Sequence, residues 1–131
     1  MINHFDFQLK LAGFNSRYLC NLMLRYPLEF ARSNFVQVQK DDSDTNFVAN
    51  IAYSANMEYQ CAQELLQNLI PALIVQKQLL ERNKEDNCAL TYALWKQTSM
   101  KAIELFIPPD ADQSFWHHVE EVTTRIHINK I

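Results

Sequence analysis

The sequence contains a single glycine, Gly13, among 131 residues. Soluble proteins contain about 7% glycine, because tight turns and hairpins use residues that tolerate a positive φ angle. A chain with so little glycine has few positions for such turns, so a protein built mainly from β-sheet is disfavoured. The same scarcity argues against the glycine-rich loops that bind phosphates and dinucleotides. The composition therefore favours helices joined by short polar loops.

Long hydrophobic runs and paired cysteines are also missing. No stretch approaches the ~18 uncharged apolar residues that a membrane-spanning helix requires. The first residues, from Met1 to Asp6, lack the basic segment and the apolar stretch of a signal peptide. The three cysteines form no Cys-x-x-Cys pair, which favours free thiols in a reducing compartment. We therefore expect a cytoplasmic protein without a transmembrane segment.

Motifs that carry catalysis or bind cofactors are likewise absent. The sequence contains no Gly-x-Ser-x-Gly nucleophile motif and no Glu-x-x-His pair of the kind used in di-iron bundles. On a helix, His117 and Glu121 would face the same way and could share a metal ion, with His118 adjacent. A metal needs three or four ligands, so a solvent-exposed polar face is the favoured interpretation. We predict that the protein is not an enzyme and has no cofactor.

The residues that are present suffice for one folded domain spanning 1–131. Hydrophobic residues make up 48% of the chain and charged residues 21%, and this length is ordinary for a single domain. The net charge of −3 is unevenly spread, because residues 1–40 contain five bases and two acids, whereas residues 41–86 contain eight acids and three bases. Opposite charges favour packing of these two segments against each other. The overall acidity gives no reason to expect nucleic-acid binding.

The strongest periodic pattern covers residues 47–81. Apolar or aromatic residues occupy nine of ten positions at alternating spacings of four and three, which is typical of the buried seam of a bundle helix. We expect Pro71 to kink this helix rather than end it, because the seam continues beyond the proline. The seam exceeds what shorter neighbouring helices can cover, so a homodimer is a further hypothesis. The ten positions are Val48, Ala52, Ala55, Tyr59, Ala62, Leu66, Leu69, Leu73, Leu80 and the polar exception Gln76.

Further helices are predicted on both sides of this segment. Apolar spacing predicts helices near residues 4–25 and 27–40, and Pro27 either starts the second helix or kinks one continuous helix. Downstream, helices are predicted over about 88–106 and 111–127. The last one begins near Asp110–Ser114 and buries Phe115, Val119, Val122 and Ile126. The predicted fold class is all-α, a mostly antiparallel bundle of four to five helices built around one long kinked helix (about 47–81).

The candidate binding surface is N-terminal. On one continuous helix over residues 4–38, Lys10, Arg17, Arg25 and Arg32 would share a sector of about 80°. Aromatic residues are interleaved with these bases, and arginine and aromatic residues are enriched at interface hot spots. The simpler interpretation is that the aromatic residues fill the core while the bases are solvated or paired. The predicted partner-binding residues are Arg17, Tyr18, Arg25, Tyr26, Phe30 and Arg32.

These observations favour a non-enzymatic protein-interaction module, such as an adaptor, chaperone, inhibitor or immunity-type helical bundle, whose partner is another protein. A first alternative is an amphipathic coat or scaffold on a lipid or polyester granule surface, because helices rich in leucine and phenylalanine suit peripheral contact. A second alternative is a small helical metal- or ligand-binding enzyme, with a site built from His117, His118 and Glu121.

Overall fold

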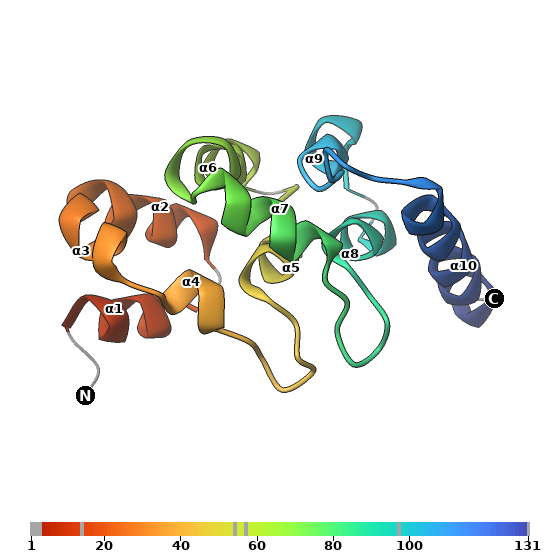
Figure 1. Ribbon diagram of the computed structural model, residues 1–131, viewed down its shortest axis with the longest axis horizontal. Coiled ribbons are helices and arrows are strands. Elements are labelled where there is room, and N and C mark those ends of the chain that lie inside the picture. The colour runs from red at the N-terminus through yellow and green to blue at the C-terminus, as the bar shows by residue number, and fades with distance from the viewer. Residues whose placement is uncertain (1–3, 14, 54, 57, 97, 131) are drawn as a thin grey trace.

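The computed structural model of the chain is an all-helical assembly, shown in Figure 1, with no β-strand among the residues it describes. These are residues 4–13, 15–53, 55–56, 58–96 and 98–130, with side chains described from Phe5 to Arg125. The all-α fold class is therefore confirmed. The elements are α1 (His4–Ala12), α2 (Ser16–Arg25), α3 (Pro27–Arg32), α4 (Phe35–Val38), α5 (Phe47–Ala52), α6 (Tyr59–Glu64), the π-helical η1 (Leu65–Leu69), α7 (Ala72–Leu80), α8 (Ala89–Trp95), α9 (Met100–Glu104) and α10 (Gln113–Lys130).

The helix predicted over residues 4–25 is divided at Gly13. This residue follows α1 with a φ of +61°, in the left-handed region that commonly ends helices. The side chain of Asn15 then caps α2 by accepting a hydrogen bond of 2.9 Å from the backbone N–H of Tyr18. Pro27 is the first residue of α3, where its missing N–H costs nothing. Of the two alternatives for Pro27, the helix start is confirmed.

The single long helix predicted over residues 47–81 is not confirmed, and the four- to five-helix bundle built around it is not confirmed either. Between α5 and α6, the described residues are turns and bends, and α6 passes into η1. Pro71 ends this segment rather than kinking it, because its ψ of 135° is extended and Ile70 donates back five residues to the carbonyl of Leu65. The spacing of four and three shows which apolar residues would share a face if the segment were helical. It does not record whether the backbone between them is continuous.

Helix α5 forms the centre of the core. Every residue of α5 is buried, and the helix packs on α7 and α8. Of the predicted seam, Val48 and Ala55 are fully buried within the chain, whereas Leu73 is 79% exposed. The seam is therefore covered at Val48 and Ala55 and uncovered at Leu73, and the homodimer stays a prediction.

A buried glutamine, Gln78, ties three helices together. Its side-chain oxygen accepts a hydrogen bond from the backbone N–H of Val48 (3.0 Å), and its Nε2 donates to the carbonyl of Val36 (2.7 Å). Its own carbonyl accepts from the side chain of Asn46, which caps α5. The side chain is only 3% exposed, so these bonds replace the water that Gln78 lost on burial.

The C-terminal third ends in α10, at the end of the molecule opposite α1 to α4 (Figure 1). The helix predicted over 88–106 is divided into α8 and α9, whereas α10 begins within the predicted window. Its cap is Asp112, whose carboxylate accepts from the N–H of Phe115 (2.8 Å). Phe115, Val119 and Val122 are buried as predicted, and the side chain of Ile126 lies outside the described residues. In the described part of the chain, no helix is both long and apolar enough to cross a membrane.

Candidate functional site

One side of α2 faces solvent with an unusual composition. Its residues follow the spacing i, i+1, i+4, i+7 and i+8, which places them on a single helix face. Two of them are large apolar side chains, with Tyr18 48% and Leu24 57% exposed, and two are arginines. Interface hot spots are enriched in arginine and tyrosine. We call this set the outer face of α2: Arg17, Tyr18, Asn21, Leu24 and Arg25, all exposed.

A groove of about 350 Å³ adjoins this face where α1 ends and α2 begins. Leu11 and Ala12 line it from α1, and Arg17 and Tyr18 line it from α2. Leu11 is 69% exposed. The Nε atom of Arg17 lies 3.7 Å from the carboxylate of Glu58, yet 73% of the arginine side chain is exposed. Arg17 can therefore reach a carboxylate on an approaching molecule.

The six predicted partner-binding residues fall into separate groups. Three of them, Arg17, Tyr18 and Arg25, lie on the outer face of α2, and Arg32 is exposed at the end of α3. The remaining two, Tyr26 and Phe30, are half-buried and pack edge-on against the buried ring of Phe5, with centroid distances of 6.1 and 6.5 Å.

The continuous basic stripe through Arg17, Arg25 and Arg32 is not formed. It required one straight helix over residues 4–38, and the breaks at Gly13 and Pro27 give each short helix its own direction. The guanidinium of Arg25 lies 5.6 Å from the ring centroid of Tyr26.

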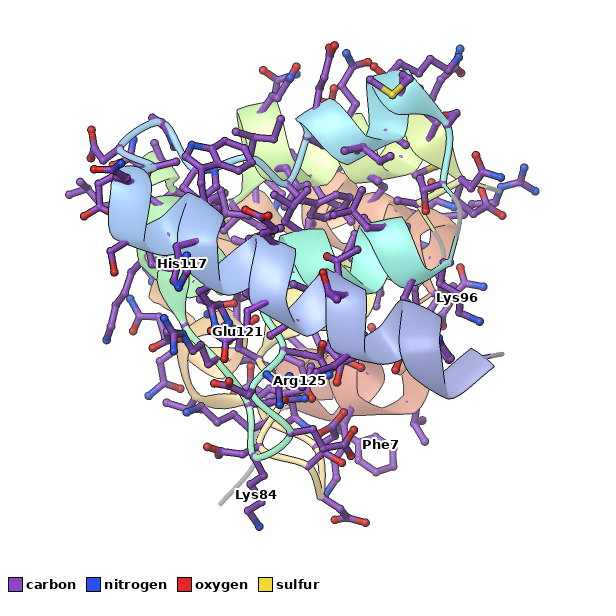
Figure 2. The ribbon with its side chains drawn as sticks, turned by 90° about the vertical axis from the view of Figure 1, so that its right-hand side faces the viewer. Phe7, Lys84, Lys96, His117, Glu121 and Arg125 are labelled. Atoms are coloured by element: carbon purple, nitrogen blue, oxygen red, sulfur yellow. The ribbon has the colours of Figure 1, made fainter. Side chains whose placement is uncertain are left out.

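His117 and His118 of α10 point in different directions. Figure 2 shows His117, Glu121 and Arg125 following one another along α10, so the predicted common face of His117 and Glu121 is present. Both are exposed, whereas His118 is 6% exposed and turned inward. Among the described residues, no cluster of three or more histidine, cysteine, aspartate or glutamate side chains could hold a metal ion. The metal-site alternative therefore has no third ligand there.

Asp86 gathers three basic side chains around the loop between α7 and α8. Its Oδ2 lies 3.2 Å from Arg125 and 3.8 Å from Nδ1 of His118, and its Oδ1 lies 3.5 Å from Arg82. The Nε2 of His118 is buried without a hydrogen-bond partner. The visible role of Asp86 is to attach the loop to α10.

A second polar cluster, which the sequence did not indicate, joins the loop before α5 to the loop after α7. The Nδ2 of Asn83 donates to the hydroxyls of Thr45 (2.8 Å) and Tyr92, and its Oδ1 accepts from the N–H groups of Glu85 and Asn87. Asn83 is 9% exposed, and its side-chain donors and acceptor are used. The available signal in the sequence was the polar composition of residues 40–46 and 82–87.

A cavity of about 330 Å³ with a mixed lining, polar at Ser33, Gln37 and Asn68, lies between the α3–α4 region and the junction of η1 with α7. Its walls include Met23, Phe30, Val36, Leu69 and Ile74, and no charged side chain lines it. Its volume is at the lower end of small-molecule pockets. No sequence pattern indicated this cavity, because it forms at the helix breaks around Pro27 and Pro71.

All three cysteines are free. Burial first, and then the neighbouring Cys61, raise the pKa of the Cys20 thiol to about 12. Cys20 is therefore a protonated thiol at neutral pH, and a thiol is a far weaker nucleophile than a thiolate. Burial likewise raises the pKa of Tyr53 to about 12, and the ammonium of Lys96 lies 5.2 Å from the centroid of that ring. The Tyr53 hydroxyl is therefore also protonated at neutral pH.

No family model, curated protein or solved structure matches this chain. Its function is therefore inferred from its own residues and their geometry.

Proposed function

We propose that this chain is a non-enzymatic protein-interaction module that binds another protein through the outer face of α2 and the adjoining groove. One observation carries this proposal. Leu11, Tyr18 and Leu24 are 69%, 48% and 57% exposed. Leu11 and Tyr18 line the groove together with the exposed side chain of Arg17, and Leu24 lies further along the same face of α2. Covering these side chains removes apolar surface from water, which is the main favourable term in protein association.

The distribution of exposed apolar side chains supports the same region. Twelve large hydrophobic residues are exposed among those described, and half of them fall within residues 1–40. Scattered single exposures are normal on a protein surface, but a local concentration marks interaction sites. The six are Phe7, Leu11, Tyr18, Leu24, Leu28 and Val38.

The charge of this face defines the chemistry of its partner. The outer face of α2 contains Arg17 and Arg25 and no acid, and residues 1–40 contain five bases and two acids. We therefore expect a partner surface with apolar side chains flanked by carboxylates. Complementary charge would speed the encounter and select against basic surfaces.

The test compares two doubly charge-reversed variants, R17E/R25E and K77E/K84E, in capture from a native cell lysate and then with the purified partner. The first pair alters the outer face of α2, and the second alters exposed lysines in and after α7. We expect the first to weaken binding of one stoichiometric partner at least about tenfold, or about 1.4 kcal/mol. The second should bind like the wild type, and both should keep wild-type helicity.

Equal binding by R17E/R25E and the wild type would refute this location of the interface. Co-sedimentation of the wild type, but not of R17E/R25E, with anionic phospholipid vesicles would favour the coat or scaffold alternative. A dimer mass by light scattering that R17E/R25E loses would identify the partner as a second copy of the chain.

A further inference from the structure

Helices α2 and α6 lie side by side (Figure 1), and Cys20 of α2 contacts Cys61 of α6 where they pack. The thiol of Cys20 donates a hydrogen bond of 3.2 Å to the backbone oxygen of Cys61. An amide oxygen lies about 2.4 Å from its own Cα, so the Cys20 sulfur is within about 5.6 Å of the Cys61 Cα. Besides burial, the neighbouring Cys61 thiol is one of the causes that raise the pKa of Cys20. A disulfide joins cysteines whose Cα atoms are about 4.4–6.8 Å apart, so its formation requires the Cys20 sulfur to turn from the Cys61 carbonyl oxygen toward the Cys61 sulfur.

The register of the two helices places Cys20 opposite Cys61. Arg17 contacts Glu58 one turn before Cys20 contacts Cys61, and both pairs are 41 residues apart in the sequence. The second contact lies three residues further along both segments than the first, so α2 and the start of α6 run in the same direction. A bond between the cysteines therefore requires no sliding of one helix along the other.

We propose that Cys20 and Cys61 form a modification site, in which a hydroperoxide oxidant converts the two thiols into a disulfide that joins α2 to α6. This inference does not depend on the partner-binding surface. It assigns a chemical role to two residues that the proposed function leaves unused.

Exposure determines the order of the steps. Cys61 is half-buried, whereas Cys20 is 5% and Cys88 only 1% exposed, so Cys61 meets the oxidant first. Its thiolate attacks one peroxide oxygen, an S–O bond forms as the O–O bond breaks, and water or an alcohol leaves, which yields a sulfenic acid. The Cys20 sulfur then attacks the Cys61 sulfur, the S–O bond breaks, and the hydroxyl leaves as water with the Cys20 proton. The two thiols have been oxidised and the peroxide reduced.

The chemistry also sets the relative rates. The raised pKa of Cys20 keeps its sulfur protonated, which slows the second step. The short separation opposes this effect, because neighbouring groups react as though at very high concentration. We therefore expect the sulfenic acid of Cys61 to form before the disulfide and to precede it in a time course.

The test treats the full-length protein with hydrogen peroxide and then denatures it for thiol counting and peptide mapping by mass spectrometry. The three thiols should fall to one, with the loss of two hydrogen atoms, a Cys20–Cys61 peptide and full recovery after dithiothreitol. The conservative variant C88S serves as the control and should form the same link. In C20S, dimedone should label Cys61 several-fold more than in the wild type, and C61S should form no link.

Three results would overturn the proposal. The first is Cys61 trapped by dimedone or oxidised to the sulfinic acid in the wild type without a bond to Cys20. The second is loss of thiols through covalent dimers or through a link to Cys88. The third is three unmodified thiols under peroxide that fully oxidises an unfolded sample of the same chain. Because the decisive measurement is made on the wild type, misfolding of a variant cannot produce any of these outcomes.

Discussion

The carboxylate of Asp86 lies 3.8 Å from Nδ1 of the buried His118, and this contact connects the loop before α8 to α10. Asp86 also has a φ of 68°, a conformation that costs most residues about 1–2 kcal/mol but is tolerated by aspartate and asparagine. Two separate properties of Asp86, its charge and its backbone tolerance, therefore hold this loop in place.

Substitutions at Asp86 can separate these two properties. Asp86→Asn removes the charge and keeps the backbone tolerance, so we expect a loss of unfolding free energy of about 1 kcal/mol, since the ion pairs are partly exposed. Asp86→Ala should lose about 1 kcal/mol more, because alanine adds the left-handed penalty. Urea unfolding measures both values. Equal stabilities of the two variants would show that the backbone conformation contributes nothing.

Gln78→Leu should destabilise the protein by about 2–4 kcal/mol in urea unfolding. The leucine fits an apolar interior, but it leaves the N–H of Val48 and the carbonyl of Val36 buried without their partners, at about 1–3 kcal/mol each. Gln76→Leu is the matched control, since Gln76 is half-buried on the same helix. It should change stability by less than about 1 kcal/mol. A mild effect of Gln78→Leu would mean that the three helices are not joined through this side chain.

Stability should fall as the pH rises above 9. The ordinary pKa of a cysteine is 9.0, and that of Cys20 is raised to about 12, so between these values the unfolded chain releases a proton that the folded chain keeps. The unfolding free energy then decreases with pH, by at most about 1.4 kcal/mol per unit. The raised pKa of Tyr53 acts in the same direction above pH 10.

Thermal unfolding in the presence of a reductant, at about pH 8 and about pH 11, checks this prediction. Cys20→Ala should show a smaller loss of melting temperature between the two pH values than the wild type. Cys88→Ala, which removes the other deeply buried thiol, is the control. An identical pH dependence of Cys20→Ala and wild type would rule out the buried Cys20 thiol as the cause.

Gly13→Ala should cost about 1 kcal/mol of unfolding free energy through its backbone alone. A Cβ added at Gly13 meets no atom within 4 Å, so the added methyl group has room. The φ of +61° is nevertheless unfavourable for alanine. Gly13→Asn should cost less, because asparagine adopts this region more readily. Chemical denaturation of the three proteins gives the order, and an alanine variant as stable as the wild type would contradict the break between α1 and α2.

The fold class could be predicted because it depends on local properties. One glycine in the chain and apolar spacings of three and four favour helices wherever those helices pack. The buried stripe through Phe115, Val119 and Val122 was predicted for the same reason. It lies on α10, which the structure describes as one unbroken helix.

The candidate site could be predicted only in part. Arg17, Tyr18 and Arg25 are brought together on the outer face of α2, because they belong to one continuous helix. Tyr26 lies beyond the end of that helix, and its ring packs against Phe5. The sequence specifies residue types, but the direction of each helix after a break determines which types share a surface.

By itself, the sequence determined that this protein is helical and which residues of each short segment are apolar enough to be buried. Those properties arise from backbone preferences and side-chain spacing over a few residues. Only the tertiary structure decided that residues 47–81 form several helices, that Gln78 is buried rather than Gln76, and that Cys20 meets Cys61. Each of these depends on contacts between segments about 30–40 residues apart, whose energies can override the local preference for one continuous helix.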